Sequence, residues 1–148
     1  MTKQLIQGME ALQHIQEGAL KLANAVSATL GPQGRNVVIE RPYSTPLVTN
    51  DGVTIAKEIE LQDPYENLGA SMLKEASIRA NSIAGDGTTT ACVLAKSMLK
   101  LGMKYLASGA NPIAMRKGME KTLQRALEKL SQNAQPICTN KQIEEIAS

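Results

Sequence analysis

Residues 85–90 are the part of the chain whose residue types are best suited to chemistry. They read Gly-Asp-Gly-Thr-Thr-Thr, and an apolar helical pattern follows them directly. Glycine lets a backbone approach a ligand closely, and the N–H groups at a helix start favour an anion. A single aspartate can hold a divalent cation between phosphate oxygens. The run predicts a site for a nucleoside triphosphate with Mg²⁺, although the same residue types also serve as ordinary helix caps.

Two further clusters have a similar polar, glycine-containing character. Residues 29–35 read Thr-Leu-Gly-Pro-Gln-Gly-Arg, which predicts a tight turn with exposed backbone groups, or simply a helix stop. Residues 50–52 read Asn-Asp-Gly, where Asp51 is either a helix cap or a group that orients water for phosphoryl transfer. The three clusters would form one functional site only if the fold brings them together.

Two common nucleotide-binding motifs are absent from the sequence. The P-loop pattern needs Gly-x-x-x-x-Gly-Lys followed by Ser or Thr, and no lysine stands in register after Gly87. The dinucleotide pattern Gly-x-Gly-x-x-Gly fails because Thr90 occupies the third glycine position. A nucleotide site in this chain must therefore have another design.

Composition favours one mainly helical domain with an aliphatic core. Of the 148 residues, 43% are hydrophobic and 20% are charged, but only 2% are aromatic, with no Phe and no Trp. This composition suits closely packed helices and argues against a β-sandwich with aromatic anchors. It also disfavours base stacking, so we expect no nucleic-acid partner, and the basic residues within 96–129 are interpreted as solvated helix faces.

The cysteines and the hydropathy pattern indicate a reducing compartment. Cys92 lies in an apolar helical run that favours a buried free thiol, and Cys138 has no pattern around it that suggests a disulfide framework or a metal site. No apolar run is long enough to span a bilayer, and the N-terminus does not resemble a signal peptide. We expect a cytoplasmic protein with no membrane partner.

Hydrophobic periodicity predicts several helices and one small β-hairpin. The expected helices cover residues 9–30, 53–59, 63–84, 91–106 and 115–130, with a short one from about residue 140, and the expected strands cover residues 36–40 and 47–49. The first helix should end at Gly31-Pro32. The nearly all-round apolar pattern of residues 91–106 predicts deep burial. The third helix carries on one face the residues Leu68, Met72, Ala76, Ala80 and Ile83.

Four segments resemble the group I chaperonins (the GroEL family). They are residues 28–38, 50–56, 84–91 and 109–112, and they stand in the same order as in that family. The resemblance runs from near Leu5 to the end of the chain. It implies a mainly α fold in which residues 1–135 are the N-terminal half of a helical equatorial ATP-binding domain. Residues 136–148 would begin an intermediate domain, and the equatorial fold would be incomplete without its C-terminal half.

The resemblance also implies roles for individual residues. Asp51 would act on the attacking water as the catalytic residue, and Asp86 would be the Mg²⁺ ligand. The backbone of Thr29 and Asn50 would help hold K⁺. The residues expected to bind ATP, including its phosphates, are Thr29, Leu30, Gly31, Pro32, Asn50, Asp86, Gly87, Thr88, Thr89 and Thr90.

The implied function is ATP-dependent assistance of protein folding by a homo-oligomeric ring, with unfolded client proteins and a co-chaperonin as partners. The family commonly has Lys where this chain has Asn50 and often Lys where it has Gln33, so a divergent paralogue with a weakened ATPase is the alternative. The isolated chain should hydrolyse ATP poorly. A further alternative is a catalytically inactive assembly module in which the hairpin of residues 36–49 pairs with a strand of a neighbour.

Overall fold

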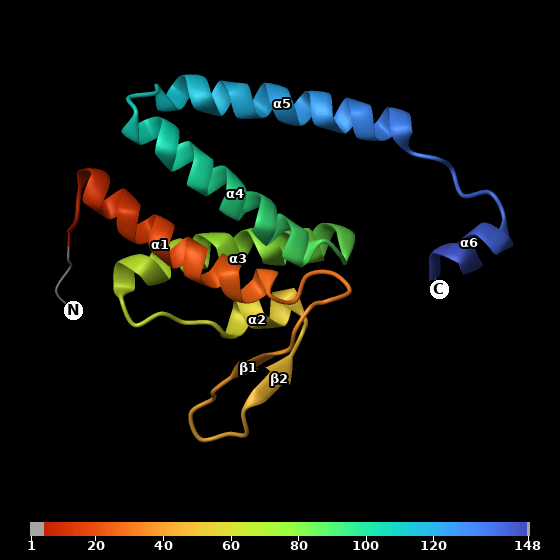
Figure 1. The fold of residues 1–148 in the computed structure, drawn as a ribbon, viewed down its shortest axis with the longest axis horizontal. Helices are drawn as coiled ribbons and strands as arrows, with labels where there is room; N and C mark the ends of the chain where they lie inside the picture. Colours follow the sequence, from red (N-terminus) through yellow and green to blue (C-terminus); the bar gives the residue numbers. More distant parts are fainter. Residues whose placement is uncertain (1–4, 148) are drawn as a thin grey trace. The chain divides into compact units, whose positions relative to one another are not determined.

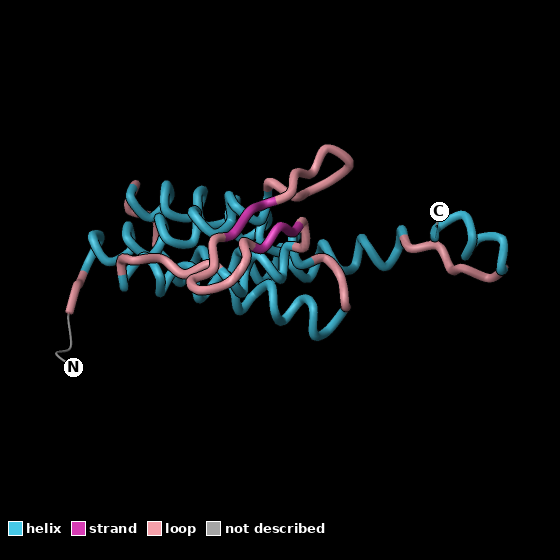
Figure 2. Tube along the Cα trace, turned by 90° about the horizontal axis from the view of Figure 1, so that it is seen from below, coloured by secondary structure: helices cyan, strands magenta, loops and turns pink. Residues whose placement is uncertain are grey.

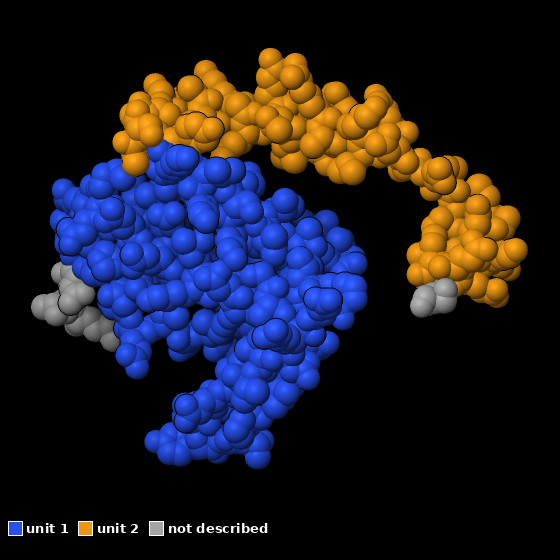
Figure 3. All heavy atoms as spheres, in the orientation of Figure 1, with its two compact units in different colours: residues 1–104 blue, residues 105–148 orange. Residues whose placement is uncertain are grey.

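The computed structural model describes residues 5–147, and these residues form helices with a single two-stranded sheet (Figures 1 and 2). The predicted mainly α fold with one small hairpin is confirmed. Two compact units are present, residues 1–104 and residues 105–148 (Figure 3). The elements in order are α1 (Gly8–Ser27), β1 (Val37–Ile39), β2 (Leu47–Thr49), α2 (Gly52–Glu58), α3 (Pro64–Ala84), α4 (Thr88–Ala107), α5 (Pro112–Asn133) and α6 (Asn140–Ala147).

Two glycines set the close crossing of α1 and α3, which lie side by side in the first unit (Figure 1). A Cβ atom at Gly18 would lie 1.7 Å from the carbonyl oxygen of Glu66, and one at Gly69 would lie 1.9 Å from that of Ile15. No side chain fits at such distances, so the two helix backbones approach each other directly at these glycines. The interior around this crossing is aliphatic, as predicted: Ala19, Leu22, Ala23, Val26, Ile55, Ala56, Ala70, Leu73 and Cys92.

The buried face of α3 differs from the apolar face that was predicted from the sequence. Leu68, Met72 and Ile83 are exposed, whereas Gly69, Ala70, Leu73 and Ser77 are buried. The small residues lie on the buried face because they alone allow α1 to pack closely against α3. The positions of the large apolar side chains therefore did not predict which face of α3 contacts α1.

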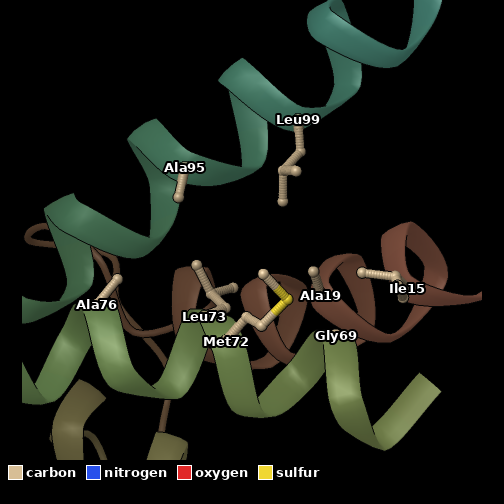
Figure 4. Close-up of a pocket in the computed structure, with 8 residues that line it drawn as sticks. All are labelled: Ile15, Ala19, Gly69, Met72, Leu73, Ala76, Ala95 and Leu99. Carbon is tan, nitrogen blue, oxygen red and sulfur yellow. The ribbon is translucent and has the colours of Figure 1, made fainter. Parts of the chain in front are cut away.

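The deep burial predicted for residues 91–106 is wrong. Only Cys92 of α4 is buried, and Leu94 and Leu101 are more than half exposed, at 59% and 57%. One face of α4 looks onto α1 and α3 across an open apolar groove of about 220 Å³ (Figure 4). On the remainder of α4, Leu94, Met98, Leu101 and Tyr105 are exposed. The groove is lined by Ile15, Ala19, Gly69, Met72, Leu73, Ala76, Ala95 and Leu99.

The first helix is shorter than its apolar pattern predicted. It ends at Ser27, and tighter turn bonds follow, from the N–H of Thr29 to the carbonyl of Val26 at 3.2 Å and from Leu30 to Ser27 at 3.3 Å. The N–H of Arg35 then donates to the carbonyl of Ala28 at 2.8 Å, which turns the chain back. Leu30 consequently lies in a turn and is 48% exposed.

The second unit consists of the end of α4 with α5 and α6. Asn111 caps α5, because its side-chain oxygen accepts from the N–H groups of Ile113 at 2.9 Å and Ala114 at 3.3 Å. No residue of α5 is buried, and its apolar residues Leu123, Leu127 and Leu130 are exposed. Among the described helices, none combines the length and the hydropathy needed to cross a bilayer.

Candidate functional site

Asp51 is the N-cap of α2. Its carboxylate accepts from the backbone N–H groups of Val53 at 3.4 Å and Thr54 at 3.0 Å, and from the hydroxyl of Thr54 as well. These bonds satisfy N–H groups that a helix start leaves without intrahelical partners. The capping interpretation of Asp51 is therefore correct. The carboxylate nevertheless remains exposed to solvent, so a cap does not prevent contact with a ligand.

The hydrogen bonds to Asp51 also fix its charge state. The hydroxyl of Thr54 is the main cause of a lowered pKa of the Asp51 carboxyl, with smaller contributions from the two backbone N–H groups and from Lys57. Partial burial opposes this change but does not cancel it. Asp51 is an anion at neutral pH, which is the form that can accept a proton or orient a water molecule.

Gly52 is the point at which two of the predicted clusters meet. A Cβ atom at Gly52 would lie 2.3 Å from Oγ1 of Thr89, 3.4 Å from Oγ1 of Thr88 and 3.2 Å from Cγ1 of Val26. The start of α2 therefore packs against the first turn of α4 and against the last turn of α1. Because Gly52 is buried at this junction, its lack of a side chain is what allows the Thr88 and Thr89 hydroxyls to approach the start of α2.

The turn between α3 and α4 contains two left-handed glycines and leads directly into a helix start. Gly85 and Gly87 adopt left-handed φ values of 70° and 75°, which other residues rarely adopt. The N–H of Gly87 donates to Oδ1 of Asp86 at 2.6 Å, and α4 begins at Thr88. The N–H groups of this first turn have no intrahelical acceptor, and they lie beside exposed Asp86. The arrangement offers N–H groups, hydroxyls and one carboxylate to a phosphate with its cation.

The third cluster adjoins the same corner through the end of α1. The hydroxyl of Thr29 donates to the carbonyl of Val26 at 2.8 Å, and the side chain of Val26 is the one that touches Gly52. The following turn is closed by a bond from the N–H of Gly34 to the carbonyl of Gly31 at 2.9 Å. A Cβ atom at Gly34 would lie 2.2 Å from the carbonyl oxygen of Thr29, so glycine is required there.

The structure thus packs the start of α2 against the first turn of α4 and against the end of α1. Leu30, Gly31, Pro32 and Asn50 are exposed to solvent. Sequence reasoning missed Thr54, whose hydroxyl holds Asp51, and the packing role of Gly52. The signal for Thr54 was available, since a threonine three residues after an aspartate cap lies within its reach.

The metal-binding chemistry of the corner depends on Asp86. In the described part of the chain there is no group of three or more His, Cys, Asp or Glu side chains placed to hold a metal ion. Mg²⁺ in nucleotide sites is usually held by one or two carboxylates together with phosphate oxygens and water. The single exposed carboxylate of Asp86, just before the start of α4, fits that donor set.

All three clusters lie within a segment that matches a known protein family. The model of the TCP-1/cpn60 chaperonin family matches residues 22–148. The match contains all three clusters, both strands, and every helix from the end of α1 onward. The chain therefore belongs to the TCP-1/cpn60 chaperonin family.

Proposed function

We propose that this chain supplies the phosphate- and magnesium-binding side of the ATP site of a chaperonin. Family membership gives it a general chaperonin role in protein folding. The observation that supports the ATP proposal is the packing of Gly52 against Thr88 and Thr89, because it brings the start of α2, which Asp51 caps, against a helix start with hydroxyl donors. The group I character indicated by residues 31–38 is part of this proposal.

In the proposed site each cluster has a separate task. The first turn of α4, with Gly87 and Thr88–Thr90, binds the phosphates, and Asp86 binds the Mg²⁺ that neutralises them. Asp51 orients the attacking water and accepts its proton. Residues 29–32 and Asn50 contact the nucleotide from the edge, and the backbone of Thr29 and Asn50 supplies oxygen ligands for K⁺.

The larger assembly is also proposed, on the basis of family membership. ATP hydrolysis would be coupled to the folding of client proteins in the cytoplasm by a homo-oligomeric ring with a co-chaperonin. Residues 1–135 would form the N-terminal half of the equatorial domain, and residues 136–148 would begin the intermediate domain. The exposed apolar side chains of α4 and α5 support an assembly in which further protein surface covers them.

The test is calorimetric titration of this chain with Mg·ATP, comparing Asp86→Asn with Asp63→Asn. Both variants replace a carboxylate by an amide of the same shape. Asp63 caps α3 by accepting from Tyr65 at 2.9 Å and Glu66 at 2.8 Å, and asparagine is an equally good cap. We expect Asp63→Asn to bind Mg·ATP normally and Asp86→Asn to lose the magnesium-dependent part of the binding. Equal binding by the two variants would exclude the proposed role of Asp86.

Asp51 needs a variant that separates capping from chemistry. Asp51→Asn keeps a helix cap but removes the proton acceptor. The proposal predicts that this variant binds Mg·ATP with unchanged affinity and shows reduced ATP turnover. Turnover that equals that of the unaltered protein would assign Asp51 to capping alone.

A further inference from the structure

A half-buried ion pair joins the hairpin to the C-terminal end of α2. Nε of Arg41, which follows β1, donates to Oε2 of Glu58 at 3.1 Å, and its Nη2 donates to Oε1 at 2.6 Å. Both carboxylate oxygens are engaged, which is the strongest geometry for an arginine–carboxylate pair. The two side chains are 37% and 32% exposed, so the pair is partly shielded from solvent.

The helix held by this pair is too short for its two ends to move independently. α2 has seven residues, and at 1.5 Å per residue it is only about 10 Å long. Its last residue, Glu58, is held by Arg41, and the carbonyl of Lys57 accepts a bond from Nζ of Lys74 at 2.9 Å. Its first residue, Gly52, packs against the Thr89 hydroxyl with no space to spare. A shift at the C-terminal end therefore reaches the phosphate-binding corner.

We propose that Arg41 is a positioning residue for the phosphate-binding corner, acting through Glu58 and α2. The pair fixes where α2 begins, and so fixes the Asp51 carboxylate relative to the first turn of α4. This inference rests on the proposed ATP site for its functional meaning. Its structural part, the control of the α2 start by Arg41, can be measured without nucleotide.

The first measurement is a double-mutant cycle on the affinity for Mg·ATP, using Arg41→Ala, Glu58→Gln and the combined variant. We expect each single change to weaken binding by about fivefold, near the upper limit measured for partly exposed pairs. Because both residues act through one contact, the combined variant should bind within about twofold of the single ones. Losses that multiply in the combined variant, or single variants that bind normally, would overturn the proposal.

Arg79→Ala is the matched control for the loss of an arginine. Arg79 pairs with Glu75 at the same Nη2–Oε1 distance of 2.6 Å, but both residues lie within α3. Its removal should leave the affinity for Mg·ATP unchanged. A loss equal to that of Arg41→Ala would show that the effect is one of general charge, and would overturn the positioning role.

Hydrogen exchange of the Val53 and Thr54 amides provides a readout that needs no nucleotide. These N–H groups bond to Asp51, so a displaced α2 start should exchange about fivefold faster in Arg41→Ala and at the normal rate in Arg79→Ala. If the unaltered chain fails to bind Mg·ATP while exchange responds, the proposed function fails and the positioning role stands. Unchanged exchange overturns the positioning role whatever the nucleotide result.

Discussion

The sharpest structural prediction concerns Gly69, where α3 touches the backbone of α1. A Cβ atom there would lie 1.9 Å from the carbonyl oxygen of Ile15, whereas ordinary contact begins at 3.4 Å, so Gly69→Ala requires a separation larger by 1.5 Å. The obstacle is backbone, which cannot rotate away as a side chain can. We expect the free energy of unfolding to fall by about 3 kcal/mol, which is in the upper part of the usual range for overpacking.

The matched control is Gly118→Ala in α5. Gly118 also lies inside a helix, but nothing lies within 4 Å of the position of its added Cβ atom. Alanine is favoured over glycine in a helix interior by about 0.8–1.0 kcal/mol, so this variant should be slightly more stable than the unaltered chain. The same chemical change is thus expected to have opposite effects at the two positions.

Urea unfolding followed by the helical circular dichroism signal measures both effects. The midpoint should fall for Gly69→Ala and rise slightly for Gly118→Ala, with unchanged slopes. Gly69→Ala should also lower Tm by about 10 °C in a domain of this size. A Gly69→Ala variant as stable as the unaltered chain would refute the direct backbone contact, and a Gly118→Ala variant that loses stability would refute the open surroundings of Gly118.

Three further outcomes are expected. Asp51→Ala should lower the free energy of unfolding by about 1 kcal/mol at pH 7 and should reduce the pH dependence of stability. The lowered pKa of Asp51 stabilises the fold above the usual aspartate range, and this stabilisation is lost as the pH falls through the lowered value. Urea midpoints at pH 7 and pH 3 measure both effects. Gly52→Ala should displace the threonine hydroxyl that lies 2.3 Å from the added Cβ atom and weaken Mg·ATP binding, and normal calorimetric affinity would contradict this. Cys138 is exposed and should react with Ellman's reagent at once. Cys92 should react only on unfolding, because burial both shields its thiol and raises the pKa of that thiol. Equal reaction rates would contradict the placement of Cys92 in the core.

The helical class, the hairpin and the candidate clusters could be predicted from the sequence because their signals are local. A glycine-proline pair, an aspartate before a glycine, and a short run of β-branched residues each act within a few residues. The helix expected over residues 63–84 likewise begins where predicted, and the carboxylate of Asp63 caps it. Order and character of the elements follow from such short-range rules.

The contacts between elements were decided by the tertiary structure. Hydrophobic periodicity predicted that α4 is deeply buried and that Leu68 and Met72 lie on the packed face of α3. Instead, α1 packs against α3 where Gly18 and Gly69 allow the two backbones to come into contact. Hydrophobic periodicity ranks side chains by hydropathy. It cannot reveal a close contact between two helix backbones, because glycine contributes almost nothing to a hydropathy pattern.

The site shows the same division between local and long-range information. By itself the sequence identified Asp51, Asp86 and the Thr88–Thr90 turn as candidates, and it correctly anticipated that Asp51 could be a cap. It could not show that the start of α2 meets the start of α4, because these segments are far apart in the sequence and their junction depends on the absence of a side chain at Gly52. Residue types determined the available chemistry, and only the packing of α2 against α4 brought that chemistry to one place.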